Sequence, residues 1–253
     1  MARKIKILLI VLLAVVFLVS AYNVGKILWD NYQAEKAYKQ LQTQYVTILP
    51  TQPQEEDSTP KPEEQTFQMA VDFDALRKVN KDVTGWLYCE DTYIHYPVVQ
   101  GKDNVKYVRT GFNGSWLISG TLFVDFRNGA LGEDTNYIIY GHNMKTDRMF
   151  GSLLKYKEQD YYESHKILYY ITPQGTYLIE PVAGRIVHEE EILYDPNPDP
   201  AEYGAFLQET KANSTFDSGI SLEEVDKWMI LSTCSQEKET TRYVLLCRYT
   251  LLG

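Results

Sequence analysis

One uncharged segment near the N-terminus constrains the fold of this chain more than any other feature. Residues Ile7 to Gly25 form a run of 19 residues that is rich in Leu, Val and Ile and has a lysine on either side. As a helix, this run spans about 28 Å, which is close to the thickness of the apolar core of a bilayer. The basic tail that precedes it, with Arg3 and Lys4, favours a cytoplasmic N-terminus and an exported remainder. We therefore expect a cytoplasmic tail at 1–6 and a single transmembrane signal-anchor at 7–25.

A cleaved signal peptide is the alternative interpretation of the same segment. Val19-Ser20-Ala21 offers small residues at the spacing that a signal peptidase requires. The apolar run is, however, longer than the usual signal-peptide core of about 7 to 15 residues, which favours an uncleaved anchor.

The next residues, 26–66, are expected to form an extracellular stalk and linker. Ile27 to Leu49 is rich in Gln, Lys, Glu and Ala and can continue as a helix. Pro50 to Gln65 contains four prolines, four glutamates and no large apolar residue, which is typical of an extended, solvated linker. A globular domain that is large enough to be catalytic should then occupy 67–253.

The composition of the exported part limits the partners that it can bind. Hydrophobic residues make up 44% of the chain and aromatic residues 13%, so most of it should fold. Residues 1–26 carry four basic and no acidic side chains, and the remainder has a formal net charge of -13. Such an acidic domain is a poor match for nucleic acid, which we exclude as a partner.

The pattern of the domain predicts a mainly β fold, either a barrel or a sandwich, with peripheral helices. A first helix is expected over Val71–Asn80 with Asp72 as its cap. Further helical segments are expected over Met149–Tyr156 and Pro200–Ala212. Short β-branched or aromatic segments separated by Gly, Asn or Asp predict strands over 85–89, 93–99, 120–125, 136–140, 166–172 and 176–182.

Near the C-terminus, two alternating segments predict a β-hairpin. Residues 227–234 and 242–249 each read as a strand, and the seven residues between them are mostly polar. If the hairpin is symmetric, Cys234 lies directly opposite Arg242, with Cβ atoms about 5 Å apart.

A thiol that faces a guanidinium is a candidate nucleophile. A neighbouring cation favours the thiolate, and the fixed fork of N–H donors of Arg242 can hold an oxyanion or a substrate carbonyl. The alternative is an edge arginine that only pairs with Glu237 or Glu239. Thiol labelling near neutral pH separates a reactive Cys234 from the incidental thiol of a binding module, because an ordinary buried cysteine stays inert.

A nucleophilic cysteine needs a proton carrier, and histidine has the most suitable ordinary pKa, about 6.5. His142 directly follows an apolar strand and a glycine, so its side chain can reach a cleft at the strand end. The other three histidines, which lie within a strand or in polar surroundings, lack this placement: His95, His165 and His188.

The other two cysteines are expected to be structural. Cys89 and Cys247 lie in apolar segments and are predicted to be small buried hydrophobes. A disulfide between them remains possible from the sequence. Because the number of cysteines in the exported part is odd, at least one must be free or paired between molecules.

Together, Gly-His-Asn-Met at 141–144, Leu-Ser-Thr-Cys at 231–234 and Arg242 resemble the signature of class B sortases. The resemblance covers roughly residues 70–253 and the N-terminal anchor. Ile230 departs from the fuller family motif, which has Thr there. Supporting matches are Gly85-Trp-Leu, Tyr96-Pro-Val-Val-Gln100, Asp103-Asn104, Gly120-Thr-Leu-Phe-Val-Asp125 and Met149-Phe-Gly151.

The resemblance implies a sortase-like eight-stranded β-barrel with N-terminal helices and a peripheral helix before the nucleophile strand. It makes Cys234 the nucleophile, His142 the general acid and base, and Arg242 the residue that orients substrate and stabilises the oxyanion. Four further positions match residues that bind the sorting signal: Thr233, Ser232, Tyr140 and Asn104.

The implied activity is that of a membrane-bound, extracellular cysteine transpeptidase. It would cleave the C-terminal sorting signal of a surface protein, of the NPQTN or NPxTx kind, after Thr through a thioacyl-enzyme. It would then transfer the protein to an amine of a peptidoglycan precursor or cross-bridge. No cofactor or metal is required, and the acidic run Glu189–Glu191 is read as a solvated loop.

Three alternatives remain open from the sequence. A pilin-polymerising sortase would use a lysine amine, whereas a cell-wall cysteine peptidase would release its product to water. A tethered binding module with an incidental thiol would do neither. The sequence also leaves open whether Glu237 assists.

Overall fold

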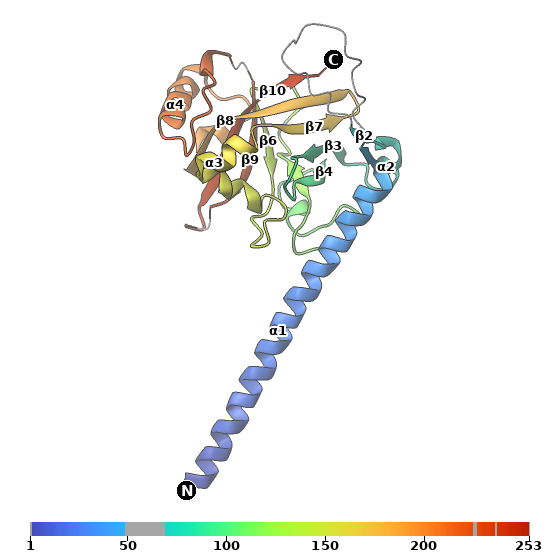
Figure 1. Cartoon of the computed structure of the whole chain (residues 1–253), viewed down its shortest axis with the longest axis vertical. Helices are drawn as coiled ribbons and strands as arrows, with labels where there is room; N and C mark the ends of the chain where they lie inside the picture. The colour runs from blue at the N-terminus through green and yellow to red at the C-terminus, as the bar shows by residue number, and fades with distance from the viewer. Residues whose placement is uncertain (1, 49–68, 225–226, 236, 253) are drawn as a thin grey trace, which may run out of the picture.

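The computed structural model describes residues 2–48, 69–224, 227–235 and 237–252. A long helix, α1 (Ala2–Tyr45), projects from a β-barrel, as Figure 1 shows. Within the described residues, α1 is the one helix that is long and apolar enough to span a membrane. The predicted linker, Pro50–Gln65, and the predicted domain boundary at residue 67 lie outside the described residues.

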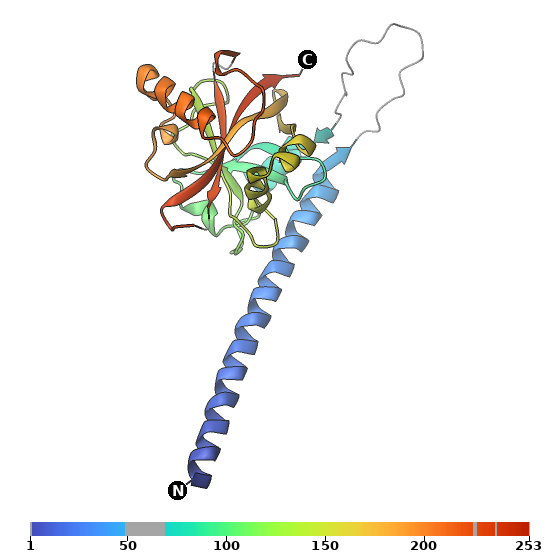
Figure 2. The same cartoon turned by 60° about the vertical axis from the view of Figure 1, so that its left-hand side comes forward.

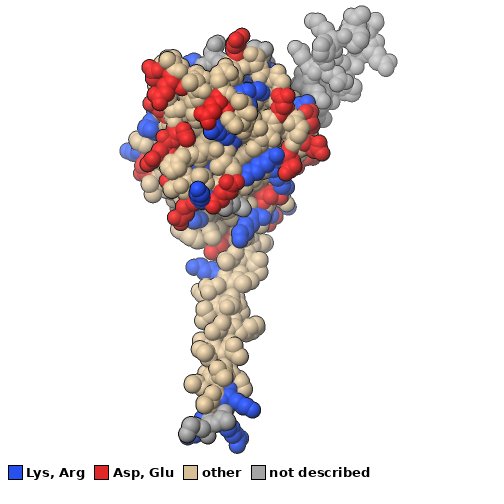
Figure 3. Space-filling view, turned by 90° about the vertical axis from the view of Figure 1, so that its left-hand side faces the viewer, with Lys and Arg blue, Asp and Glu red and all other residues tan. Residues whose placement is uncertain are grey.

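The charge distribution along α1 fits its apolar composition. Figure 3 shows basic side chains at the far end of the helix, then a stretch without charged side chains, and mixed charges where the helix meets the barrel. The side chains of the uncharged stretch, including Leu8, Phe17 and Leu18, are exposed in the isolated chain. Such an exposed apolar surface is consistent with a single membrane anchor.

The eight-stranded β-barrel expected for the domain is confirmed. The ring closes in the order β10-β8-β7-β3-β4-β5-β6-β9, and β9 pairs back with β10. The β4–β5 and β6–β9 pairs are parallel and the other six are antiparallel. The strands are β3 (Val83–Tyr88), β4 (His95–Gln100), β5 (Leu122–Val124), β6 (Asn136–Tyr140), β7 (Leu168–Thr172), β8 (Gly175–His188), β9 (Trp228–Cys234) and β10 (Thr241–Leu251).

Each predicted strand overlaps an observed one, and two bounds differ for physical reasons. The strand predicted to end at residue 182 continues to His188, because β8 pairs with the long strand β10 along its length. The strand predicted from Gly120 begins two residues later. Gly120 has a φ of 56°, and a Cβ there would lie 2.2 Å from the carbonyl oxygen of Tyr107, so the position suits only glycine.

The predicted helices are also present, with one change of type. Asp72 caps α2 (Phe73–Val79) by accepting a hydrogen bond from Ala75 N at 2.9 Å. The helix predicted over Met149–Tyr156 is the 3₁₀ helix η2 (Gly151–Lys157). It begins after Met149, because that residue has a φ of 52° and cannot belong to a right-handed helix. The remaining helical elements are η1 (Lys106–Val108), α3 (Gln159–Ser164), η3 (Ile192–Tyr194), α4 (Pro200–Ala212) and η4 (Leu222–Glu224).

Both faces of the strands that lead to the C-terminal hairpin are buried. Inside the barrel, Ile139, Leu231 and Leu245 join one apolar core. On the outside, a second apolar cluster includes Ile230 of β9 and Phe206 of α4, so this wall is covered as well. Strands that are buried on both sides are held firmly, which fixes the position of whatever lies at their ends.

The C-terminal part of α1 packs directly on the barrel. Ala34 and Tyr38 are buried, and the Tyr38 hydroxyl donates to the carbonyl of Gly120. After α1, the short strand β1 (Val46–Ile48) pairs antiparallel with β2 (Met69–Val71). Figure 2 shows these two strands side by side at the end of α1. The chain therefore reaches the barrel before residue 49.

Candidate active site

The hairpin of β9 and β10 brings a thiol and a guanidinium together at its open end. Cys234 is the last residue of β9 and pairs in register with Arg242 of β10, as the sequence predicts. The six residues of β9 before Cys234 are buried, whereas Cys234 itself is exposed. The thiol is therefore accessible at a rigid strand end.

The neighbouring strand brings His142 to the same end of the barrel. β6 runs parallel to β9 with Tyr140 opposite Ser232, and Gly141 N donates to Ser232 O at 3.1 Å. A Cβ at Gly141 would lie 2.5 Å from the side chain of Leu122. A side chain at this position would collide with its neighbours, so glycine suits the close packing next to His142.

Burial keeps the imidazole of His142 neutral. Removal from water lowers the pKa of His142 and is the largest effect. A hydrogen bond to the carbonyl of Val108 partly opposes the shift, and the charge of Arg109 adds to it. The ring atom Nε2 lies 2.8 Å from Val108 O. Because a carbonyl only accepts, Nε2 carries the proton and Nδ1 is left as the acceptor of the neutral ring.

Two side-chain hydrogen bonds tie the loop of His142 to the strand of Cys234. The Thr233 hydroxyl donates to Gly141 O at 2.8 Å, and Asn143 Nδ2 donates to Cys234 O at 2.8 Å. These bonds couple the two backbones on either side of the thiol and the imidazole.

The partners of Arg242 differ from the ion pair with Glu237 or Glu239 that the sequence left open. The guanidinium pairs with the Glu189 carboxylate at 2.5 Å, and it donates to the backbone carbonyl of Glu239 rather than to its side chain. Glu237 pairs with Lys157 at 3.2 Å. The expected alternative partners of Arg242 thus do not engage it through their carboxylates.

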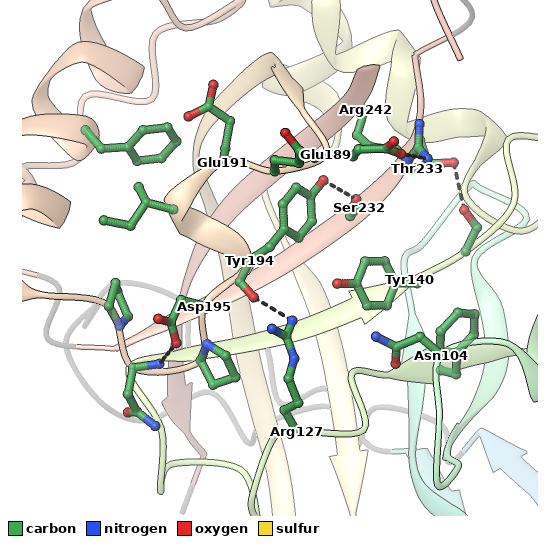
Figure 4. A pocket seen from close by; sticks show the side chains of 18 of the residues that line it. Asn104, Arg127, Tyr140, Glu189, Glu191, Tyr194, Asp195, Ser232, Thr233 and Arg242 are labelled. Atoms are coloured by element: carbon green, nitrogen blue, oxygen red, sulfur yellow. Dashed lines mark hydrogen bonds and ion pairs between the residues drawn. The ribbon is translucent and has the colours of Figure 1, made fainter. Parts of the chain in front are cut away.

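A groove of about 1510 Å³ joins these groups. Figure 4 shows side chains from part of its lining, among them Arg242 and Thr233. All seven residues that the sequence analysis singled out line it. Its far wall is formed by the segment from Glu189 to Asp199 and by α4. The chain between β8 and β9 therefore contributes one side of the groove. The seven residues are Asn104, Tyr140, His142, Ser232, Thr233, Cys234 and Arg242.

A buried carboxylate organises the floor of the groove, and sequence reasoning missed it. Asp125 is fully buried and accepts hydrogen bonds from Asn104 Nδ2 at 2.9 Å and from the Tyr140 hydroxyl at 2.9 Å. Arg127 binds both of its oxygens, at 2.9 and 2.8 Å. Burial alone would raise the pKa of Asp125, but these donors outweigh it and the pKa is lowered. An acidic residue that ends an apolar strand is the signal that marks it in the sequence.

Tyr194 is a second residue that the sequence analysis did not identify. Its hydroxyl shares a hydrogen bond with the Ser232 hydroxyl at 2.8 Å, and its ring stacks on Tyr140 with centroids 6.1 Å apart. Arg127 Nη2 donates to Tyr194 O at 2.7 Å. Burial raises the pKa of Tyr194, so it stays a neutral phenol. Figure 4 shows it between Ser232 and Arg127.

The other cysteines are free and buried, which leaves Cys234 as the exposed thiol. Burial raises the pKa of Cys89 to about 11 and also raises that of Cys247. The predicted disulfide alternative is therefore absent. Among the described residues, no group of three or more His, Cys, Asp or Glu side chains is placed to hold a metal ion.

Comparisons with known proteins agree on one family. The model of the family described as "Sortase domain" matches residues 87–250. The chain is 29% identical to sortase B of Staphylococcus aureus over 238 residues, which cover 93% of this chain and 92% of that protein. It is 34% identical to sortase B of Listeria monocytogenes over 165 residues, or 65% of this chain and 67% of that protein. The solved structure of a Staphylococcus aureus sortase B–substrate complex matches with a TM-score of 0.65 and 31% identity, over 72% of this chain and 85% of that one.

Proposed function

Because this chain belongs to the sortase family as a class B sortase, and so is a cysteine transpeptidase, we propose that Cys234, His142 and Arg242 carry out its reaction. The observation that carries the proposal is the in-register pair of Cys234 and Arg242 at the rim of the groove that His142 also lines. Each residue has a separate task.

In the first step, the sulfur of Cys234 attacks the carbonyl carbon of a threonine in a sorting signal. The Cys234 proton passes to Nδ1 of His142, the ring nitrogen that the Val108 carbonyl leaves unprotonated. Negative charge develops on the carbonyl oxygen, and the guanidinium of Arg242 stabilises it. The C–N bond then breaks as His142 returns the proton to the departing amine, which leaves a thioester on Cys234.

In the second step, an amine attacks the thioester carbonyl. His142 accepts the proton of the amine, a new amide bond forms, and the sulfur of Cys234 departs and is reprotonated. The substrate that we assign is a surface protein with a sorting signal of the NPQTN or NPxTx kind, cleaved after Thr. The acceptor that we assign is an amine of a peptidoglycan precursor or cross-bridge.

The apolar run in α1 supports a location at the cell membrane with the barrel outside the cell. One such anchor, with basic residues before it, keeps the groove close to the surface from which a membrane-retained substrate emerges. Confinement to that surface raises the effective concentration of substrate, which favours transfer.

The test uses the full chain in detergent micelles with an NPQTN peptide and a panel of amines. We expect mass spectrometry to detect a thioester on the wild-type chain and none on Cys234→Ala, whose melting temperature should be unchanged because Cys234 is exposed. Arg242→Lys should lose about 100-fold or more in kcat/KM, since a point charge cannot replace the fork.

Undiminished cleavage by Cys234→Ala would refute the nucleophile, and near-normal turnover by Arg242→Lys would remove Arg242 from the reaction. If the peptide is only hydrolysed, with no transfer to any of the added amines, the protein is instead a peptidase. A preference for a lysine-containing peptide over cell-wall amines would identify a pilin polymerase.

A further inference from the structure

Glu189 makes the strongest contact to Arg242, and no sequence motif pointed to it. Its Oε2 lies 2.5 Å from Arg242 Nη2. Arg242 Nη1 donates to two backbone carbonyls, those of Glu239 at 2.5 Å and Thr241 at 3.1 Å. The side chains of Arg242 and Glu189 are 25% and 41% exposed, so water screens this pair only in part.

The sheet fixes the backbone of Glu189 relative to Arg242. In the β8–β10 ladder, His188 pairs with Thr241 and Val187 pairs with Arg242. Glu189 is the next residue along, and its N–H donates to Thr240 O at 2.9 Å. The carboxylate therefore starts from a defined position beside the guanidinium rather than from a free loop.

These contacts divide the donors of the guanidinium into two sets. An arginine has five N–H donors, and the three bonds above use both donors of Nη1 and one of Nη2. The donors that are left belong to Nε and Nη2. Arg242 lines the groove, where two such donors can bind one oxygen of a ligand.

We propose that Glu189 is the positioning residue of this sortase, and that it clamps the guanidinium of Arg242 so that Nε and Nη2 face the scissile carbonyl. This inference rests on the proposed role of Arg242. Without the carboxylate, the guanidinium is held only through Nη1, so Nη2 and Nε lose their fixed direction.

The clamp has a second consequence, through charge. The negative charge of Glu189 offsets part of the positive charge of Arg242 that would stabilise a thiolate on Cys234. Removal of this charge should make the thiol more reactive toward a small electrophile, while loss of the clamp should make the enzyme slower with its peptide. The two effects have opposite signs, whereas general damage to the site would lower both rates.

The experiment compares Glu189→Ala and Glu189→Gln with the wild-type chain in micelles. For Glu189→Ala, we expect kcat/KM for the sorting peptide to fall about tenfold. Glu189→Gln keeps an oxygen that accepts from Nη2, so its kcat/KM should stay within about threefold of wild type. In both variants, iodoacetamide should alkylate Cys234 about two- to fivefold faster at pH 7.

Glu163→Gln is the matched control. Glu163 lies in α3 outside the groove, its side chain is 48% exposed, and it pairs with Lys166 rather than with Arg242. Its substitution removes the same charge, and both rates should change by less than about 1.5-fold. Thermal unfolding of all three variants should match that of wild type, since the substituted side chains are at the surface.

The inference is overturned if Glu189→Ala keeps kcat/KM within twofold of wild type, or if Glu189→Gln is as impaired as Glu189→Ala. Slower alkylation in either variant would also overturn it. Failure of the proposed function has a different signature, because Arg242→Lys would then turn over the peptide normally. Normal turnover by Arg242→Lys refutes the role of Arg242. If Arg242→Lys loses activity but Glu189→Ala turns over the peptide normally, only the clamp is refuted.

Discussion

Cys234 and His142 reach the groove through different backbone settings. Cys234 is the exposed end of a strand that is otherwise buried on both faces. His142 follows a glycine that is packed against Leu122, and its ring is partly withdrawn from water. The thiol is thus open to a substrate, while the imidazole is held in one tautomer by a backbone carbonyl.

The burial of His142 leads to a prediction about its titration. Because the fold lowers its pKa, the imidazole should titrate with a midpoint below the ordinary value of about 6.5. The neutral ring therefore stabilises the folded state fully above pH 6.5, and this contribution is lost as the pH falls through the lowered pKa. NMR titration of histidine-labelled chain measures the midpoint directly.

His95 serves as an internal reference in the same titration, since burial lowers its pKa to about 4. A midpoint for His142 at or above 6.5 would contradict the assignment. It would mean that the ring is exposed or that a carboxylate faces it.

At the scale of single residues, the sequence predicted contacts within the hairpin but not contacts between distant segments. The pairing of Cys234 with Arg242 was predictable because the connecting loop is short and polar, so symmetry sets the register. Glu189 and Asp125 directly follow other strands, β8 and β5. Their contacts depend on the order of strands around the barrel, which spacing along one segment does not contain.

At the scale of elements, the loop after β6 is held at both ends. Asn143 binds the carbonyl of Cys234 at one end, and Arg148 pairs with Glu35 of α1 at 2.9 Å at the other. On either side of Arg148, Asp147 and Met149 have positive φ values of 60° and 52°. Non-glycine residues in this conformation cost about 1 kcal/mol or more each, so the tertiary contacts of the loop must offset the strain.

A charge-reversal pair tests whether α1 supports this loop. We expect Arg148→Glu, which faces Glu35, to lower kcat/KM about two- to fivefold, and we expect the double variant Glu35→Arg/Arg148→Glu to recover most of the loss. The effect should be small because Glu35 is 52% exposed. Steady-state kinetics with the sorting peptide measures the coupling.

Glu35→Arg alone is the other single variant of this double-mutant cycle, and its kcat/KM should fall by about the same factor as that of Arg148→Glu. Equal rates in both single variants and wild type would contradict support of the loop by this pair. A double variant that is worse than either single variant would do so as well.

For the molecule as a whole, α1 carries the apolar segment that we propose as the membrane anchor, and its C-terminal part packs on the barrel. Tyr38 is buried against the barrel and forms an edge contact with Tyr96, with ring centroids 5.0 Å apart. Gln42 Nε2 donates to His95 O at 2.8 Å, and the pairing of β1 with β2 follows. The anchor and the barrel are therefore joined by packing as well as by the chain.

Two shortened chains test this packing. A chain that begins at residue 27 keeps these contacts, whereas one that begins at residue 67, the domain boundary predicted from composition, loses them. Loss of the buried Tyr38 and Ala34 and of the β1 partner should cost roughly 3 kcal/mol and lower the melting temperature by roughly 10 °C. Scanning calorimetry of both chains measures the difference, and equal melting temperatures would contradict it.

The sequence by itself determined the apolar N-terminal segment, the mainly β class, the hairpin register and the seven candidate groove residues. These depend on local pattern, on spacing or on motifs that lie close together along the chain. Only the tertiary structure decided that α1 packs on the barrel, that Asp125 and Tyr194 shape the groove, and that Glu189 rather than Glu237 or Glu239 offers its carboxylate to Arg242. The reason is that these contacts join residues far apart in sequence, and barrel closure selects them from many partners of similar chemistry.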